Sequence, residues 1–241
     1  ALAWLALAGN TLYYLLLSAA VQTGGIAMTS LVIGFLPVAV TIVGSRDDGA
    51  VPLGRLLPSI ALCAAGAVCI GWQALGGPDL GRAGSRGVGL LCAIGALASW
   101  TIYAVGNSRW LARLDHVSAH DWNLLTGVVT GAQASALIPA ALALGERRHD
   151  AAAWGRLAVV AAGVAVLASI LGNLLWNKMS RLLPLIGQMI LFETLFALIY
   201  GFLWERRLPT PLEGAAFVLV VLSVTSCIFA HRKAEILEAH A

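Results

Sequence analysis

The sequence contains little charge. Of its 241 residues, 11% are Asp, Glu, Lys or Arg, whereas 59% are hydrophobic. A soluble domain carries about a quarter charged residues, because its surface faces water. The shortage excludes an ordinary soluble domain and indicates that much of the surface faces lipid.

Basic clusters and a cysteine framework are also missing. The formal net charge is +3, and the Lys and Arg residues stand singly or in pairs. Nucleic-acid-binding proteins gather such residues on one face, so no nucleic-acid partner is expected. The four cysteines all lie inside apolar runs, where thiols behave as small hydrophobic side chains. Neither a disulfide framework nor a metal site is therefore expected.

Catalytic signatures are absent from the sequence. There is no HExxH, no G-x-S-x-G and no Walker loop, and no His lies in an apolar run to serve a nucleophile. We expect no catalytic residues, no cofactor and no enzymatic activity, and the chain by itself is not an ATP-driven pump.

Long apolar runs dominate what is present. A helix needs about 20 apolar residues to cross a hydrocarbon layer of about 30 Å. Eight runs qualify, at residues 1–22, 26–44, 56–76, 87–107, 122–144, 157–177, 182–204 and 212–230. The sequence therefore predicts an all-α polytopic membrane protein. Pro37 and Pro139 lie inside runs and are expected to kink them or open them locally.

The basic residues and most tryptophans lie at or near the edges of these runs. All 15 Lys and Arg residues lie at or outside run edges, as expected because a cation in the bilayer centre costs several kcal/mol. Five of the eight tryptophans lie near run ends, as in an interfacial aromatic belt. Basic residues divide eight to seven between the two sides, so charge does not orient the chain.

A weak internal repeat suggests two halves. GNTLYY (9–14) and GNLLWN (172–177) are each followed by an apolar run, an acidic link, a Pro and another apolar run. Two runs precede the second copy and none precedes the first, so we expect two further helices ahead of this chain. Five helices per half would insert in opposite senses, an inverted repeat common in secondary transporters. We expect helices equivalent to 3–5 of ten in residues 1–76, helices 6–10 in 87–230, and a polar tail at 231–241.

Polar and aromatic side chains form stripes on four of the predicted helices. At 100° per residue, each of the following sets shares one helix face. The sets are Asn10, Tyr13 and Tyr14; Trp100, Tyr103 and Asn107; Trp122, Thr126, Thr130 and Gln133; and Ser169, Asn173, Trp176 and Asn177. Any one stripe is explained by hydrogen bonds between helices, but four together favour a wet central cavity.

Such a cavity favours a neutral or zwitterionic cargo. Aromatic rings stack on planar groups and attract ammonium groups, and amides both donate and accept hydrogen bonds. A phosphate or nucleotide cargo would require basic residues in mid-span, and the sequence has none there. Glu193 is the sole acidic residue deep within a run. It serves proton coupling, grips a cationic group, or is a protonated carboxyl bonded to a neighbouring helix.

Two segments carry a resemblance to a known family. They are SWTIYAVGNSRWL (99–111) and GNLLWNKMSRLLPLIGQMILFETLFALIYGFLWERRLPTPLEG (172–214). The chain resembles the drug/metabolite transporter (DMT) superfamily, EamA type, and within it the bacterial aromatic amino-acid exporters of the YddG type. The resemblance implies ten helices in two inverted five-helix repeats, a central substrate cavity, and a location in the bacterial inner membrane. The first two family helices have no counterpart in this chain.

The resemblance and the stripes together predict an exporter. We expect a secondary transporter of small amphipathic metabolites, foremost aromatic amino acids, working by alternating access in the lipid bilayer. The predicted substrate-binding residues are Tyr13, Tyr14, Trp100, Tyr103, Asn107, Asn173, Trp176 and Asn177. The alternatives are a DMT carrier of nucleotide sugars or phosphate esters, a membrane-embedded enzyme, and a structural subunit.

Overall fold

Helices make up nearly all of the structure. The computed structural model describes residues 1–45, 52–76, 80–111, 113–114, 117–144, 150–167 and 186–238. Within these ranges the chain forms helices joined by links, and no strand occurs. The prediction of an all-α protein is confirmed.

The first two predicted spans are each built from consecutive helical pieces. The first consists of α1 (Leu2–Ala6), a π-helical turn η1 (Leu7–Thr11) and α2 (Leu12–Gly24), and the second of α3 (Ile26–Ile33) and α4 (Leu36–Gly44). The remaining helices are α5 (Leu53–Gly76), α6 (Leu80–Leu111), α7 (Ala119–Leu144), α8 (Ala151–Val164), α10 (Ile186–Glu205) and α11 (Pro211–Glu238).

Six described segments are long and apolar enough to cross a membrane. They are Leu2–Gly24, Ile26–Gly44, Leu53–Gln73, Gly84–Leu111, Asp121–Ala143 and Pro211–Ala230. Each coincides with one of the eight predicted runs. The other two runs, 157–177 and 182–204, overlap α8 and α10 and lie partly outside the described residues. The polytopic architecture is therefore confirmed, and α11 continues as a helix into the predicted tail.

The chain divides into two compact units. The first comprises residues 1–132 and 187–241, and the second comprises residues 133–186. Helix α7 begins in the first unit and ends in the second, which also contains α8. All features discussed below belong to the first unit.

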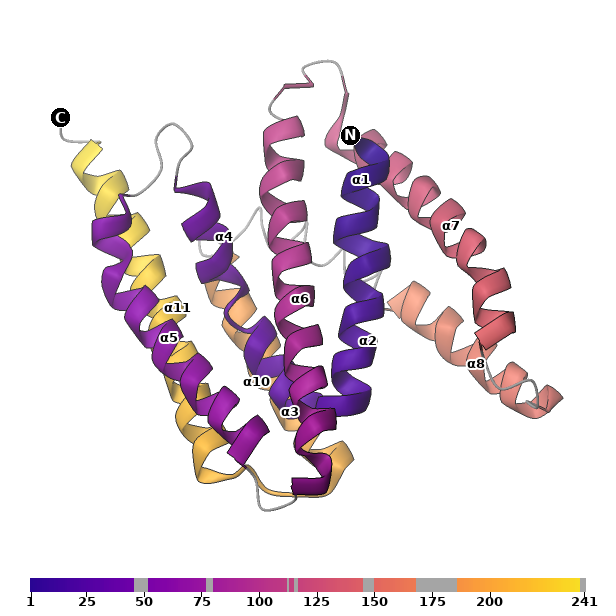
Figure 1. Cartoon of the computed structure of the whole chain (residues 1–241). Coiled ribbons are helices and arrows are strands. Elements are labelled where there is room, and N and C mark those ends of the chain that lie inside the picture. The colour runs from indigo at the N-terminus through magenta and orange to yellow at the C-terminus, as the bar shows by residue number, and fades with distance from the viewer. Residues whose placement is uncertain are drawn as a thin grey trace. The chain divides into compact units, whose positions relative to one another are not determined.

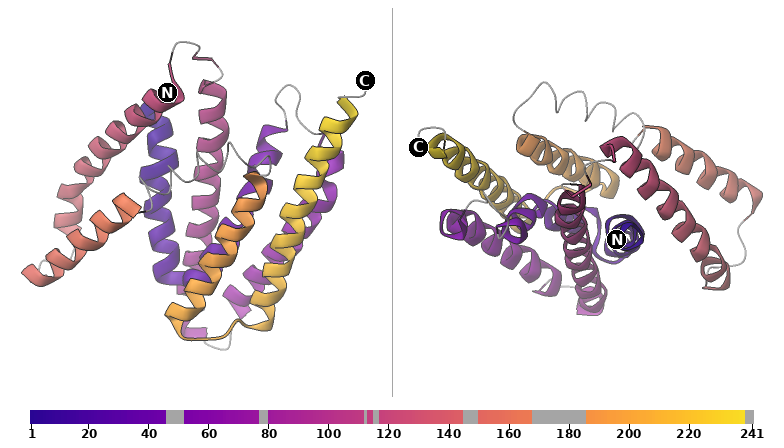
Figure 2. Two further views of the ribbon diagram at one scale, coloured as in Figure 1. Left: turned by 180° about the vertical axis from the view of Figure 1, so that it is seen from behind. Right: turned by 90° about the horizontal axis from the view of Figure 1, so that it is seen from above.

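Helices of the first unit pack in side-by-side pairs. Helix α2 lies along α6, and α5 lies along α11 (Figures 1 and 2). Leu31 and Val38 from the second span meet Leu56 of α5 and Val220 and Val224 of α11 in a fully buried cluster. This cluster fixes how the three spans pack together.

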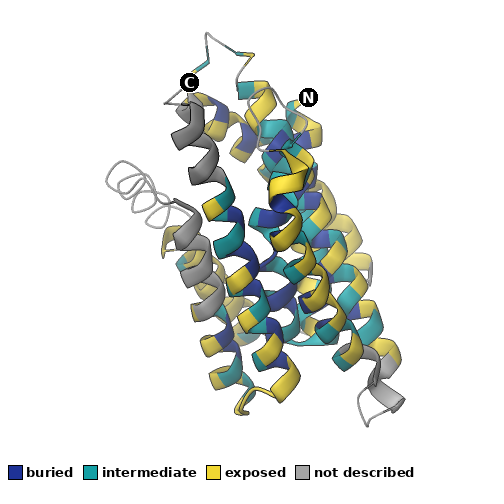
Figure 3. Cartoon of the chain, turned by 90° about the vertical axis from the view of Figure 1, so that its left-hand side faces the viewer, coloured by how far each residue is buried: buried dark blue, intermediate teal, exposed yellow. Residues whose placement is uncertain are grey.

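Large hydrophobic side chains cover the outward faces. Leu57 and Trp72 of α5 and Leu91 of α6 are each at least 62% exposed. Figure 3 shows buried residues along the facing sides of the helices and exposed ones on the outer sides. A water-soluble protein rarely exposes so much apolar surface, so these faces contact lipid.

A reciprocal serine pair joins α5 to α11. The Ser59 hydroxyl donates to the Ser223 carbonyl at 2.8 Å, and the Ser223 hydroxyl donates to the Ser59 carbonyl at 2.8 Å. Both side chains are fully buried. Small hydroxyl residues at such an interface allow close approach and satisfy polar groups where water is absent.

The second span is interrupted near its middle. Helix α3 ends at Ile33, and α4 begins at Leu36 with Pro37 in its first turn. Because proline has no N–H group, it fits a first helical turn and not a helix interior. The predicted local opening at Pro37 is therefore confirmed, whereas α7 continues as one helix through Pro139, from Ala119 to Leu144.

Candidate functional site

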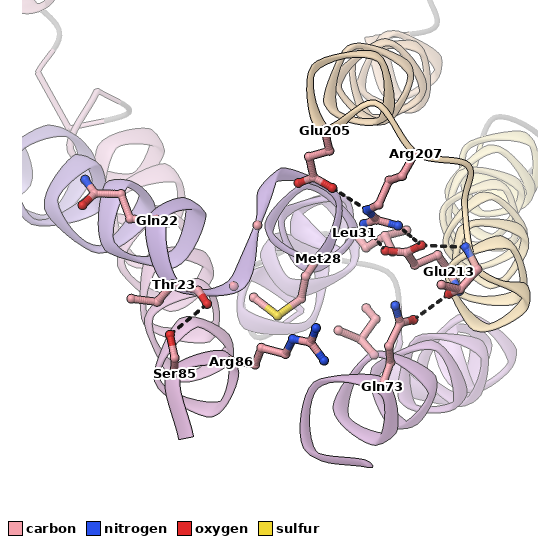
Figure 4. A pocket seen from close by; sticks show the side chains of 14 residues that line it. Gln22, Thr23, Met28, Leu31, Gln73, Ser85, Arg86, Glu205, Arg207 and Glu213 are labelled. Atoms are coloured by element: carbon pink, nitrogen blue, oxygen red, sulfur yellow. Dashed lines mark hydrogen bonds and ion pairs between the residues drawn. The ribbon is translucent and has the colours of Figure 1, made fainter. Parts of the chain in front are cut away.

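A cavity of about 640 Å³ opens where several helices of the first unit end (Figure 4). We call it the end cavity. It is lined by Gln22, Thr23, Gly24, Gly25, Met28, Leu31, Ile70, Gln73, Ser85, Arg86, Glu205, Arg207, Thr210 and Glu213. The volume lies within the range of about 300–1,000 Å³ typical of small-molecule sites.

The link between α2 and α3 forms one wall of the end cavity. Gly25 has φ = 87°, a left-handed conformation that favours glycine. Its N–H group donates to the Val21 carbonyl at 3.0 Å and so closes the last turn of α2. This tight reversal lets α3 return beside α2 within one residue, which brings Met28 and Leu31 into the cavity.

An ion-paired triad, Glu205–Arg207–Glu213, forms the opposite wall. The Arg207 guanidinium donates to both Glu213 oxygens at 2.6 and 2.7 Å, and its Nε donates to Glu205 Oε2 at 2.7 Å. Hydrogen bonding to Glu213 raises the pKa of Arg207 despite partial burial, and Glu205 adds to the effect. One guanidinium between two carboxylates leaves the triad with one excess negative charge.

Glu213 is held by the start of α11. It accepts from the Thr210 N–H at 2.7 Å, while the Thr210 hydroxyl accepts from the Glu213 N–H at 3.2 Å. This reciprocal arrangement is a capping box, with Pro211 at the first helical position. The Thr210 hydroxyl also contacts Gln73 of α5 at 3.1 Å. The helix start therefore positions a carboxylate that is only 4% exposed.

Glu205 connects the end of α10 to the start of α3. Its Oε1 accepts from the backbone N–H of Ile26 at 2.8 Å. The first N–H groups of a helix have no partner within the helix and carry partial positive charge, so a carboxylate there is stabilising. The Glu205 side chain is 20% exposed, which leaves part of its charge facing the end cavity.

Arg86 supplies a cation on the α6 side. Figure 4 shows its guanidinium between Met28 and Gln73, with the triad beyond them. Within the described part of the chain, Arg86 has no ion-pair or hydrogen-bond partner. Its neighbour Ser85 donates to the Thr23 carbonyl at 3.3 Å, which fixes this turn of α6 against α2.

Four of the five predicted aromatic site residues lie on the paired spans α2 and α6. The Tyr13 and Tyr14 ring centroids are 5.1 Å apart, and those of Trp100 and Tyr103 are 5.9 Å apart, both edge to face. The Tyr103 ring lies over Gly9, where a Cβ atom would overlap it. Tyr14 is 62% exposed, whereas the other three are partly buried.

A π-helical turn lies beside this aromatic group. The turn η1 contains Asn10, and the neighbouring carbonyl of Ala8 accepts from the Ser99 hydroxyl at 2.7 Å. Single π-helical turns occur frequently at functional sites, because they redirect side chains and free backbone groups. The sequence gives no simple signal for such a turn.

Asn107 forms a hydrogen bond between neighbouring helices. Its Oδ1 accepts from the indole N–H of Trp122, which is buried on α7, at 2.6 Å. For this pair, the sequence analysis offered either a place in a wet cavity or a hydrogen bond between helices, and the structure shows the hydrogen bond. Thr126 and Thr130 donate to carbonyls one turn earlier in their own helix.

The other predicted site residues are not described. Asn173, Trp176 and Asn177 lie outside the described residues. Glu193 lies on α10, and its side chain is not among those described.

None of the five described site residues lines the end cavity. The end cavity is built instead from helix ends and links, and no sequence pattern predicted that their polar residues lie together. The T-x-x-E pattern at Thr210 was the one local signal of its geometry.

A second, more open groove of about 590 Å³ lies along α10 and α11. It is lined mainly by apolar side chains, with Arg206 and Arg207 at one end. Arg206 has a positive φ of 52° and is exposed. No group of three or more His, Cys, Asp or Glu side chains able to hold a metal occurs in the described residues.

The fold and the end cavity define a multi-pass membrane protein with a solute-sized cavity lined by both polar and apolar side chains. The chain is 29% identical over 238 residues to the inner membrane protein YtfF of Escherichia coli strain K12, across 93% of this chain and 74% of YtfF. YtfF is named as a membrane protein and not as an enzyme. No family profile and no solved structure matches the chain. The predicted location in a bacterial inner membrane is confirmed by this similarity and the six spans.

Proposed function

We propose that the chain is a secondary transporter that exports small amphipathic metabolites, foremost aromatic amino acids, by alternating access. The end cavity carries this proposal. Polar groups from α2, α5, α6, α10 and α11 converge there on a space of about 640 Å³. A structural subunit has no need of such a space, whereas a carrier must admit its cargo between spans.

The aromatic stripes supply the deeper part of the route in this proposal. The cargo ring stacks against the predicted aromatic residues on α2 and α6, and its polar end meets the predicted amides. The residues in this role are Tyr13, Tyr14, Trp100, Tyr103, Asn107, Asn173, Trp176 and Asn177. Residues 1–76 and 87–230 belong to two inverted repeats that rock about this route.

The charges of the end cavity favour amino acids over phosphate esters. Its charged residues are Arg86, Arg207, Glu205 and Glu213, whose formal charges cancel. A phosphate dianion would meet one free guanidinium and the excess negative charge of the triad. A molecule with no net charge meets no such conflict.

Counterflow in liposomes tests the proposal. The full-length protein is reconstituted with unlabelled solute inside, and uptake of labelled solute is followed for aromatic, aliphatic and cationic amino acids and a sugar phosphate. We expect phenylalanine, tyrosine and tryptophan to accumulate above protein-free liposomes. Accumulation of the sugar phosphate alone would support the phosphate-ester carrier, and accumulation of nothing would contradict a carrier.

Trp100→Ala should weaken transport of phenylalanine and tryptophan more than it lowers protein abundance. Removal of the indole deletes a stacking surface worth about 1 kcal/mol, or about fivefold in affinity. The matched control is Trp72→Ala, because Trp72 is 70% exposed on the outward side of α5. Equal initial rates for Trp100→Ala and the wild type, at equal protein in the liposomes, would remove Trp100 from the route.

Glu193→Gln tests proton coupling in the same liposomes. If Glu193 couples transport to protons, an imposed pH gradient accelerates the wild type, and the variant loses that acceleration while still exchanging solute. Glutamine keeps the shape and cannot titrate. A variant that responds to the gradient as the wild type does would assign Glu193 to gripping the cargo or to helix packing.

A further inference from the structure

The end cavity separates its charges onto two walls. Arg86 lies on α6, and the Glu205–Arg207–Glu213 triad lies at the ends of α10 and α11 (Figure 4). Between the walls lie the apolar side chains of Met28, Leu31 and Ile70. An apolar floor between opposite charges suits a small molecule that carries both signs.

The negative wall has one carboxylate with hydrogen-bonding capacity left for a cation. Glu213 is 4% exposed, and both its oxygens accept from Arg207, so its charge is neutralised within the protein. Glu205 accepts one bond from Arg207 and one from the Ile26 N–H, and part of it remains exposed. Since each carboxylate oxygen accepts two hydrogen bonds, Glu205 retains capacity for an ammonium group.

The positive wall has one guanidinium free to receive an anion. Within the described residues Arg86 has no partner, whereas Arg207 uses Nε and both terminal nitrogens on carboxylates. A guanidinium binds a carboxylate through two parallel hydrogen bonds. A partly buried cation without a partner is costly, so a bound carboxylate offsets that cost.

We propose that the end cavity binds a small zwitterion of the amino-acid class, with its carboxylate on Arg86 and its ammonium on Glu205. The inference rests on the proposed function and assigns charge recognition to residues that are separate from the aromatic stripes. Gln73 lies beside Arg86 in the end cavity, and its amide N–H₂ group can donate to the same carboxylate (Figure 4).

Binding of three related compounds tests the assignment. The purified protein is placed in phosphatidylcholine nanodiscs, and affinities are measured for L-phenylalanine, phenethylamine, which lacks the carboxylate, and 3-phenylpropionate, which lacks the ammonium. Arg86→Gln should weaken phenylalanine and phenylpropionate about tenfold or more and leave phenethylamine within about twofold. Arg86→Lys should recover part of the phenylalanine affinity.

Two further variants complete the experiment. Arg206→Gln is the matched control, because Arg206 is exposed and lines the outer groove instead of the end cavity, and all three affinities should stay unchanged. Glu205→Gln should weaken phenylalanine and phenethylamine but not phenylpropionate. Because Glu205 also caps α3, the assignment is judged first on Arg86→Gln, whose side chain has no described partner to lose.

The result that overturns the inference is a phenylalanine affinity unchanged by Arg86→Gln, or an equal loss for phenethylamine. A phosphatidylethanolamine head group offers similar chemistry, so the nanodiscs are also made with that lipid. Two results together would assign the end cavity to lipid. The phenylalanine affinity would fall as the phosphatidylethanolamine content rises, and in pure phosphatidylcholine it would not depend on Arg86. Wild-type counterflow of phenylalanine with normal Arg86→Gln rates would leave the transporter proposal standing and reject this inference alone.

Discussion

Gly89→Ala is expected to lower the unfolding temperature of the protein in detergent. A Cβ atom at this position would lie 2.6 Å from the backbone nitrogen of Gly24 and 2.7 Å from its Cα. Backbone atoms in a tight turn cannot rotate away as a side-chain end can. Such overpacking costs about 1–3 kcal/mol, and we expect the upper part of that range.

The matched control is Gly84→Ala in the same helix. A Cβ atom there meets nothing within 4 Å, so alanine should be neutral or slightly stabilising, because alanine favours helices by about 1 kcal/mol over glycine. The measurement is the temperature at which half of the protein leaves the monodisperse peak in size-exclusion chromatography. Equal melting of the two variants would show that α6 does not approach the α2–α3 link this closely.

Arg207→Gln is expected to cost about 2 kcal/mol of stability. Its loss leaves the Glu213 carboxylate buried and without a counter-charge, and removal of one partner of a buried pair is strongly destabilising. The estimate is below the usual 3–5 kcal/mol, because the Arg207 side chain is 38% exposed and water screens part of the interaction.

A second substitution separates the charge effect from a loss of packing. Adding Glu213→Gln removes the uncompensated charge, so the double variant should be more stable than Arg207→Gln alone. Arg206→Gln, one residue away and exposed, should leave the melting temperature unchanged. A double variant less stable than Arg207→Gln would mean that the two side chains stabilise the fold by packing and not by charge. One such packing contact is that of the Arg207 guanidinium with the Phe202 ring, whose centroid lies 5.1 Å from Cζ.

Hydropathy predicted the spans well because the bilayer imposes one strong requirement on each of them. The long described spans follow the predicted runs, and the interruption at Pro37 follows from the missing N–H of proline. The same reasoning extended α11 only to residue 230, although the helix runs to Glu238. A polar helical turn beyond the membrane gives no hydropathy signal.

The end cavity was not predicted, because its residues lie in segments that hydropathy treats as solvated links. Arg86 is 119 residues from Glu205 and 121 residues from Arg207 along the chain, and only packing brings Arg86 to face these two. Periodicity within one helix cannot reveal such a meeting. The stripe argument worked at shorter range, since it placed Trp100 beside Tyr103, but it could not tell that Asn107 is engaged by Trp122.

The mutual hydroxyl–carbonyl exchange between Ser59 and Ser223 constrains how the molecule can move. A slip of one helix by a single residue would break both bonds at once and leave two hydroxyl groups without these partners in an apolar layer. Helices α5 and α11 are therefore expected to move together as one rigid body. In the proposed alternating-access cycle, bending is expected instead in the second span, where the helix is already interrupted at Gly34 and Phe35.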